Sequence, residues 1–355
     1  MEIYVKNTNF EVVGVVDTFK SFIWTDRYCG YGDFELYTPM NTELIETIKM
    51  DYYLSIGESE HTMIVENISI ESDVEDGDML KITGRSLESI LDRRIIWGSK
   101  ILKGELQTVI KEIINESIIL PSIAERKIEN FKFIETDDAE VAALTVEETE
   151  YNGDTIYDVV SSLCSDGGIG FKILLNEEDE FEFFLYSGDD LSYEQTDNPY
   201  VTFSPEFDNL INSNYIESKQ EYKNVTLVIG EKVGDSAPKT AVAGEASGLD
   251  RRELYTEASD ISQTQDNDTQ ISSSEYKKLL TQRGNEELQN KKISKTFDGE
   301  FDTTQLYTYN DDFYMGDIVQ LANAYNMTAR ARIVEFILSQ DENGYSMYPT
   351  FSILE

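Results

Sequence analysis

Two stretches of the chain resemble each other, and this repetition narrows the choice of fold more than any other pattern does. Ile-Val-Glu tripeptides begin at Ile64 and at Ile333, and each opens a run rich in β-branched and apolar residues. An acidic turn with a glycine, Gly77 or Gly344, follows each run at a place where a hairpin can require a positive φ. The aromatic-rich runs that precede the two copies span residues 51–56 and 312–318. Because the order of the parts repeats, we predict a duplicated β-barrel with other segments inserted between the copies.

Residues 1–97 are dominated by strand patterns and are predicted to form the first barrel. Phe34, Leu36 and Thr38 alternate with charged or polar neighbours, which is typical of a strand with one covered face. Short helices or turns are expected near residues 42–50 and 86–94.

Residues 98–199 have a different character. Apolar residues recur at helical spacing over residues 105–118, which predicts an amphipathic helix that ends before Pro121. A second such pattern over 155–164 begins at a threonine cap and ends at paired glycines. Since a hairpin pattern follows at 171–185, we predict an inserted α+β domain.

Strand patterns return at residues 200–232 and 293–355, and these are predicted to form a second, split barrel. The interruption, residues 233–292, consists of a small and polar stretch predicted to be a flexible loop (234–248) and a helix (272–292). The predicted fold class is therefore mainly β, with two β-barrels and inserted segments that contain helices.

The charge of the chain excludes one class of function. The 69 acidic residues outnumber the 29 basic ones, and the net charge is −40. A surface that holds nucleic acid needs clusters of Lys and Arg, so nucleic-acid recognition is not expected. Solubility or a high-salt habitat remains an alternative explanation of the acidity. Two cysteines, no signal-peptide pattern and no long apolar run predict a protein folded in a reducing cytoplasm, without a membrane span.

The residues offer little for catalysis. His61 is the single histidine, so a nucleophile such as Cys29 could be activated only by it. Asp266, Asp268 and Gln270 follow the spacing of calcium-binding loops, but the glycine and final glutamate of that motif are missing. We therefore predict no catalytic site, no cofactor and no metal site. A calcium ion in some acidic loop stays an alternative.

Motif positions spread over nearly the whole chain resemble the siphovirus tail hub proteins. Trp24, Arg27, Gly30, Gly32 and Phe34 match the W-x-x-R-x-x-G-x-G-x-F pattern of that family. Further matching positions are Asn209, Asn224, Arg251, Arg252, Gly316 and Asp317.

The resemblance implies a baseplate hub at the virion tail tip, assembled in the cytoplasm of the bacterial host and also similar to the hubs of contractile tails. Such hubs are trimers in which each chain supplies two tail-tube-like barrels, so that six barrels cap a six-fold tube and adapt it to a three-fold tip. The implied partners are a tail tube or distal tail protein above, the tape measure protein, and a fibre, spike or receptor-binding protein below. Many relatives continue into a fibre or wall-cleaving domain; this chain stops at Glu355, so such activity is expected on another polypeptide or beyond a truncation.

DNA is expected to pass through the ring without specific binding. Glu66, Glu71 and Glu335 are our candidates for acidic side chains on the channel wall, where they would keep duplex DNA from adhering. Two other functions stay open from the sequence: a tail-associated cell-wall hydrolase, and an acidic surface or adhesion protein of a salt-adapted cell.

Overall fold

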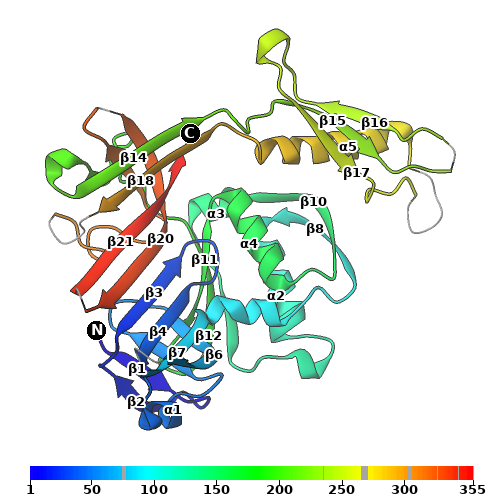
Figure 1. Ribbon diagram of the computed structural model, residues 1–355. Coiled ribbons are helices and arrows are strands. Elements are labelled where there is room, and N and C mark those ends of the chain that lie inside the picture. The colour runs from blue at the N-terminus through cyan, green and yellow to red at the C-terminus, as the bar shows by residue number, and fades with distance from the viewer. Residues whose placement is uncertain are drawn as a thin grey trace. The chain divides into compact units, whose positions relative to one another are not determined.

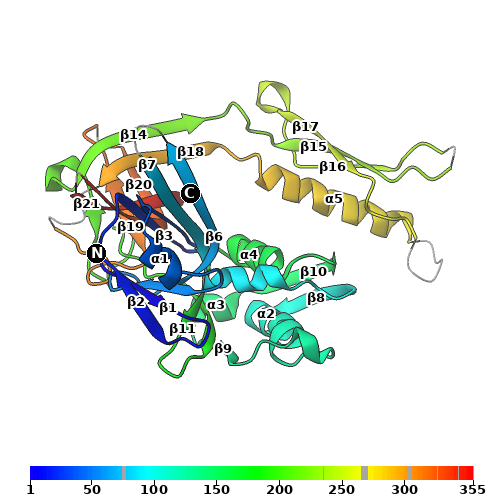
Figure 2. The same cartoon turned by 60° about the horizontal axis from the view of Figure 1, so that its bottom comes forward.

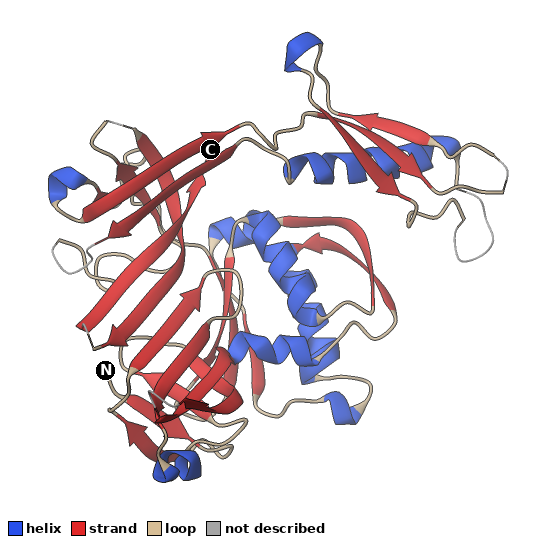
Figure 3. Ribbon diagram, viewed as in Figure 1, coloured by secondary structure: helices blue, strands red, loops and turns tan. Residues whose placement is uncertain are grey.

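The computed structural model describes residues 1–73, 77–234, 236–264, 271–301, 306–325, 327–342 and 344–354 (Figure 1). The chain divides into two compact units, which we call the main unit (residues 1–213 and 298–355) and the small unit (214–297). Strands predominate in the main unit (Figure 3). None of the helices in the described ranges is long and apolar enough to cross a membrane.

An eleven-stranded sheet organises the main unit. Its strands follow the order β13-β19-β20-β3-β4-β7-β6-β5-β1-β2, and β21 pairs with β20 outside this path. Their bounds are β1 Ile3–Lys6, β2 Val12–Val16, β3 Ser21–Arg27, β4 Asp33–Pro39, β5 Tyr53–Ile56, β6 Thr62–Asp73, β7 Gly77–Ser86, β13 Thr202–Phe203, β19 Ile318–Ala322, β20 Thr328–Asp341 and β21 Gly344–Leu354.

The two similar stretches fold into equivalent meanders. Strands β5, β6 and β7 form one antiparallel set, and β19, β20 and β21 form the other. In both sets the middle strand shifts register within its Ile-Val-Glu tripeptide, between Val65 and Asn67 in β6 and between Ile333 and Glu335 in β20. Such a shift is a β-bulge, which bends the strand and increases its twist. The acidic turns at 74–76 and at 343 lie outside the described residues.

Both meanders belong to one sheet, whereas the sequence predicted two separate barrels. β3 pairs with β20 of the second meander, with Trp24 opposite Leu338, and β4 pairs with β7 of the first. The hairpin β3–β4 therefore joins the two copies, and among the described strands no closed barrel is present. Its buried side chains include the aromatic series Phe22, Trp24 and Phe34, whose rings contact in sequence.

The α+β part of the main unit packs around an apolar core. Helix α2 (Leu106–Ile114) continues as a short π-helix, η2 (Asn115–Ile119), so the single helix predicted for 105–118 changes its hydrogen bonding near the end. Helix α4 (Ile156–Gly167) begins as predicted, because the hydroxyl of Thr155 accepts from the N–H of Asp158 at 3.0 Å. The strands are β8 Ser99–Glu105, β9 Phe131–Ile134, β10 Thr145–Asn152, β11 Gly170–Leu175 and β12 Phe181–Tyr186. Figure 2 shows α2 beside the ribbon β8–β10.

Shorter elements complete the main unit. They are α1 Thr42–Thr47, η1 Leu87–Arg93, η3 Ala124–Arg126, α3 Ala139–Ala143 and η4 Pro205–Phe207. Two paired strands, β14 Leu210–Ser218 and β18 Ser294–Phe301, carry the chain into and out of the small unit.

The small unit is a three-stranded sheet with one helix. β15 (Val225–Gly230) runs parallel to β17 (Glu253–Ala258) and antiparallel to β16 (Thr240–Ala243). Helix α5 (Ser273–Gln289) buries Tyr276 and Leu280 against this sheet. The remaining helical turn is η5, Gly248–Asp250. The prediction of a flexible loop over 234–248 is therefore wrong at residues 240–243, which form β16. The small unit also contains β15, which the sequence analysis assigned to the split barrel.

Candidate functional site

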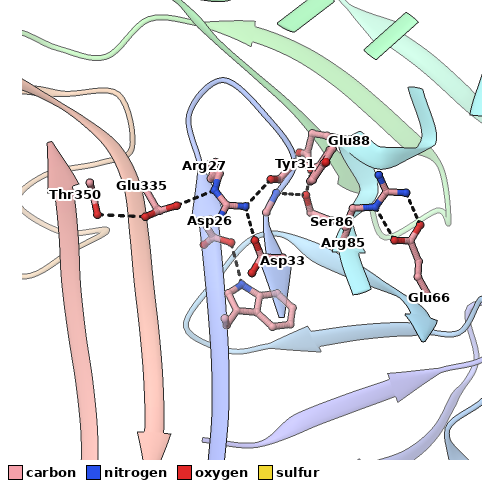
Figure 4. A network of polar contacts seen from close by, with 12 residues as sticks. Asp26, Arg27, Tyr31, Asp33, Glu66, Arg85, Ser86, Glu88, Glu335 and Thr350 are labelled. Carbon is pink, nitrogen blue, oxygen red and sulfur yellow. Dashed lines mark hydrogen bonds and ion pairs between the residues drawn. The ribbon is translucent and has the colours of Figure 1, made fainter. Parts of the chain in front are cut away.

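The hairpin between β3 and β4 carries five of the eleven motif positions, and Arg27, the last residue of β3 before the turn, bonds to groups on both sides. Its Nε donates to Glu335 Oε2 on β20 at 2.7 Å, and its Nη1 donates to the carbonyl of Tyr31 at 3.0 Å and pairs with Asp33 on β4 (Figure 4). Thr350 on β21 donates to the other oxygen of Glu335 at 3.2 Å. One guanidinium therefore ties the end of the hairpin to the second meander.

Arg85 on β7 makes the equivalent pair in the first meander. Its Nε and Nη2 donate to the two oxygens of Glu66 at 2.6 and 2.9 Å, and Nη1 donates to Asp92 at 3.1 Å. The guanidinium also lies over the ring of Tyr31, 4.7 Å from its centroid. The glutamates of both Ile-Val-Glu tripeptides are thus neutralised by arginines. Glu71, in contrast, is exposed and lies near the C-terminal end of β6.

Asp26 on β3, His61 and Glu88 form a buried group of ionisable side chains. Trp24 Nε1 and Ser59 Oγ donate to the carboxylate of Asp26 at 2.9 and 2.7 Å. Glu88, which is fully buried in η1, accepts from the backbone N–H of Ile173 at 2.7 Å and from Ser86 Oγ. His61 Nδ1 lies 3.3 Å from Glu88 Oε1, an ion pair without a well-aligned hydrogen bond.

The charges of this group follow from its surroundings. Burial disfavours the imidazolium, but the carboxylates of Asp26 and Glu88 raise the pKa of His61 to about 9. Burial likewise opposes ionisation of Glu88, yet His61 and its hydrogen bonds hold the pKa of Glu88 below its usual value. Burial raises the pKa of Asp26. At neutral pH the site therefore contains an imidazolium–carboxylate pair that joins the loop before β6 to η1 and β11.

We expect this pair to make stability fall at alkaline pH. The pKa of His61 is about 9 in the folded chain and 6.5 as its ordinary value, so its contribution is fully present below pH 6.5 and is lost as pH rises through about 9. Urea unfolding at about pH 6.5 and about pH 10 should show a loss of up to roughly 3 kcal/mol that is missing in His61→Gln. Equal losses in the two proteins would contradict this assignment.

Gly316 and Asp317 connect two loops that are distant in the sequence. The carboxylate of Asp317 accepts from the N–H groups of Asp189 and Tyr314 at 2.8 and 2.7 Å, and burial raises its pKa to about 6. A Cβ on Gly188 would lie 2.0 Å from the carbonyl carbon of Gly316, so only glycine lets these two loops meet. These contacts hold the segment before β19 against the segment that follows β12.

The other motif positions hold local backbone in place. Asn209 is buried; its Oδ1 accepts from the N–H of Ser204 at 2.8 Å and its Nδ2 donates to the carbonyl of Thr202 at 2.9 Å. In the small unit, Asn224 accepts from the N–H of Arg252 at 2.8 Å. The remaining positions are Arg251, which pairs with Glu253, Gly30 in the β3–β4 turn, and Gly32, whose N–H donates to Ser86 Oγ at 2.7 Å. These bonds are those of structural residues.

In the part of the chain that the structure describes, Cys29 and His61 do not form a nucleophile–base pair. Cys29 Sγ donates to the carbonyl of Ser161 at 3.3 Å, and burial raises the pKa of this thiol to about 11, which disfavours the thiolate at neutral pH. His61 instead pairs with Glu88. The stretch with Asp266, Asp268 and Gln270 lies outside the described residues, and within them no cluster of three or more His, Cys, Asp or Glu could hold a metal ion.

Comparison with known proteins places this fold among tail proteins. The 43 kDa tail protein of prophage MuSo2 from Shewanella oneidensis shares the fold with a TM-score of 0.61 and 14% identity, over 100% of this chain and 98% of that one. The tail protein from Neisseria meningitidis MC58 gives a TM-score of 0.57 and 10% identity, over 99% and 96%. For the prophage tail protein gp18 from Listeria monocytogenes EGD-e these values are 0.52, 9%, 99% and 94%.

A comparison of the sequence with protein-family models identifies the family. A comparison with curated proteins gives no match. The family model described as Siphovirus ReqiPepy6 Gp37-like protein, in contrast, matches residues 1–351. This chain therefore belongs to the Siphovirus ReqiPepy6 Gp37-like family of siphovirus tail proteins.

Proposed function

We propose that the protein is the structural hub of a siphovirus tail tip. The observation that carries the proposal is the shared fold over essentially the full length of three tail proteins, together with two equivalent meanders joined in one sheet. Three copies form a ring that caps the tail tube, and each copy presents two tube-like β-elements toward it. Six such elements match a six-fold tube while the ring itself keeps three-fold symmetry.

In this role the neighbours of the ring are the tail tube or distal tail protein above, the tape measure protein, and a fibre, spike or receptor-binding protein below. The ring is assembled in the host cytoplasm and resides at the virion tail tip. DNA crosses it without specific binding, in keeping with the net charge of −40 per chain.

The ion pairs refine which side chains can make the channel wall acidic. Glu66 and Glu335 are each paired with an arginine, so they present little net charge to passing DNA. Carboxylates such as the exposed Glu71 are better placed to keep the duplex from adhering.

We propose no catalytic activity for the chain. His61 and Cys29 are each engaged by other groups, and the raised pKa of the thiol disfavours its nucleophilic form. A host cell-wall preparation embedded in a gel should stay intact around the purified chain. Clearing of the gel would favour the wall-hydrolase alternative.

The copy number in assembled tails tests the hub directly. A cryo-electron microscopy reconstruction of the tail tip should show three copies of the chain in a closed ring at the end of the tube. Tails from a phage without this gene should lack a tip. Six copies, one copy, or a location on the cell surface instead of the virion would overturn the proposal.

A further inference from the structure

Arg94, directly after η1, and Arg126, at the end of η3, have no carboxylate partner among the described residues of this strongly acidic chain. Although the sequence has 69 acidic residues, no described carboxylate lies within ion-pairing distance of Arg94 or Arg126. Their bonds go to backbone carbonyls instead. Arg94 Nε donates to the carbonyl of Arg126 at 2.9 Å and its Nη1 to that of Arg93 at 2.8 Å, while Arg126 Nη2 donates to that of Ile95 at 2.6 Å.

The positive charges of these arginines repel one another. Burial lowers the pKa of Arg94, and the neighbouring guanidiniums of Arg126 and Arg93 lower it further. Within the described ranges Arg93 pairs with a single carboxylate, that of Asp51, at 3.6 Å. Holding such charges together costs free energy, and an anion placed between them would recover it.

Exposed apolar side chains border the two arginines. The Arg126 guanidinium lies over the ring of Trp97, 5.1 Å from its centroid, and Trp97 is 67% exposed. Ile95 and Ile123 are also exposed on the same two segments. We call Arg94, Ile95, Trp97, Ile123 and Arg126 the arginine–tryptophan patch. Tryptophan and arginine are the residues that most often dominate binding energy at protein interfaces.

The arginine–tryptophan patch is rigidly built. The N–H of Ile96 donates to the carbonyl of Asp154, and the N–H of Ile156 donates to that of Arg94, each at 2.9 Å. The N–H of Arg126 donates to the carbonyl of Ile123 at 3.0 Å. A guanidinium has five N–H groups, and the described contacts use two of them on Arg94 and one on Arg126. The free donors are therefore held in fixed positions, which reduces the entropy lost on binding.

We propose that the arginine–tryptophan patch docks an acidic segment of a neighbouring protein, in which carboxylates flank an apolar side chain. The carboxylates accept from Arg94 and Arg126, and the apolar side chain packs against Trp97. Charge complementarity favours this occupant, because the patch is a local positive site. Nucleic acid fits poorly, since the net charge of −40 around the patch repels a polyanion that extends beyond it. The inference concerns a surface of the α+β part and holds whether or not the chain forms a three-fold ring.

Photo-crosslinking in assembled tails tests the docking. Ile123→p-benzoylphenylalanine is introduced into the full chain, tails are irradiated, and the crosslinked peptide is sequenced. We expect a peptide of another tail protein that carries Asp or Glu within a few residues of an apolar one. Crosslinks to this same chain, to DNA, to a peptide without carboxylates, or to nothing would each overturn the proposal.

Substitutions in that crosslinking chain separate docking from folding. Arg94→Glu with Arg126→Glu should lower the crosslink yield at least about tenfold, and Trp97→Ala, a change at an exposed side chain, should do the same. The matched control is Lys103→Glu with Lys111→Glu, two paired surface lysines of the same α+β part and the same change of charge. The control yield should stay within about twofold. If Trp97→Ala leaves the crosslink intact in tails that assemble normally, the patch does not dock a partner.

Discussion

Glu88→Ala should lower the free energy of unfolding by about 3–5 kcal/mol, the cost of breaking a buried ion pair from one side. The substitution removes the carboxylate that lies 3.3 Å from the buried imidazolium of His61, so that only the charge of Asp26 remains to balance it, and leaves the N–H of Ile173 without the acceptor that Glu88 supplies. Because the pair joins η1 to the loop before β6 and to β11, the loss affects both the sheet and the α+β part. Urea unfolding followed by tryptophan fluorescence measures it, since Trp24 is buried beside Asp26.

Glu88→Gln is the matched control for this experiment. Glutamine has the shape of glutamate and keeps an acceptor for Ile173, but it cannot balance the imidazolium. We expect a smaller loss than for Glu88→Ala, and one that shrinks at high pH, where His61 in the variant is neutral. A loss below about 1 kcal/mol for Glu88→Ala would mean that the pair does not hold these elements together.

Gly84→Ala should destabilise the chain by at least about 3 kcal/mol, and we expect most of the variant to be insoluble on expression. Gly84 lies on β7 opposite Val65, beside the β-bulge in β6. A Cβ there would lie 1.8 Å from the carbonyl oxygen of Ile64 and 2.9 Å from a ring carbon of Phe34. The bulge brings the two backbones together, so relief requires β6 itself to move.

Gly57→Ala provides the comparison, because a Cβ on Gly57 would have no heavy atom within 4 Å. Its unfolding midpoint should match that of the parent chain within experimental error, corresponding to a change of about 0.5 kcal/mol or less. Soluble Gly84→Ala with a parent-like midpoint would show that the bulge in β6 is not a fixed feature of the sheet.

The local elements could be predicted because their signals are local. Helix α4 was predicted from its apolar spacing and from the cap at Thr155, and α2 from the apolar stripe that ends before Pro121. The two meanders were likewise visible as a repeated order of strand and turn. Even β16 has a signal, since alanines alternate with the β-branched Thr240 and Val242, but without large apolar residues the stretch resembles a loop.

The pairing of the sheet and its charges could not be predicted, because both depend on distant partners. No pattern within β3 indicates that its neighbour is β20, so the two meanders were assigned to separate barrels. The same holds for the candidate site. Glu66 and Glu335 were chosen for an acidic wall, while the arginines that neutralise them stand on other strands. Glu88 occurs in an ordinary apolar helical turn, and only the fold shows that it is buried beside His61.

The pairing of β3 with β20 also affects how the protein is made. Arg27 and Glu335, which join these strands, are 308 residues apart in the chain. At roughly 5–20 residues per second, a ribosome needs on the order of 15–60 s to synthesise that length. During that time β4 is available to pair with one edge of β3, whereas β20, which covers the other edge in the folded chain, has not been synthesised. An open edge accepts any compatible strand, including β20 of a second nascent chain on the same messenger RNA. Strand-swapped dimers are therefore the misfolded product to expect from rapid overexpression, and slower translation should reduce them.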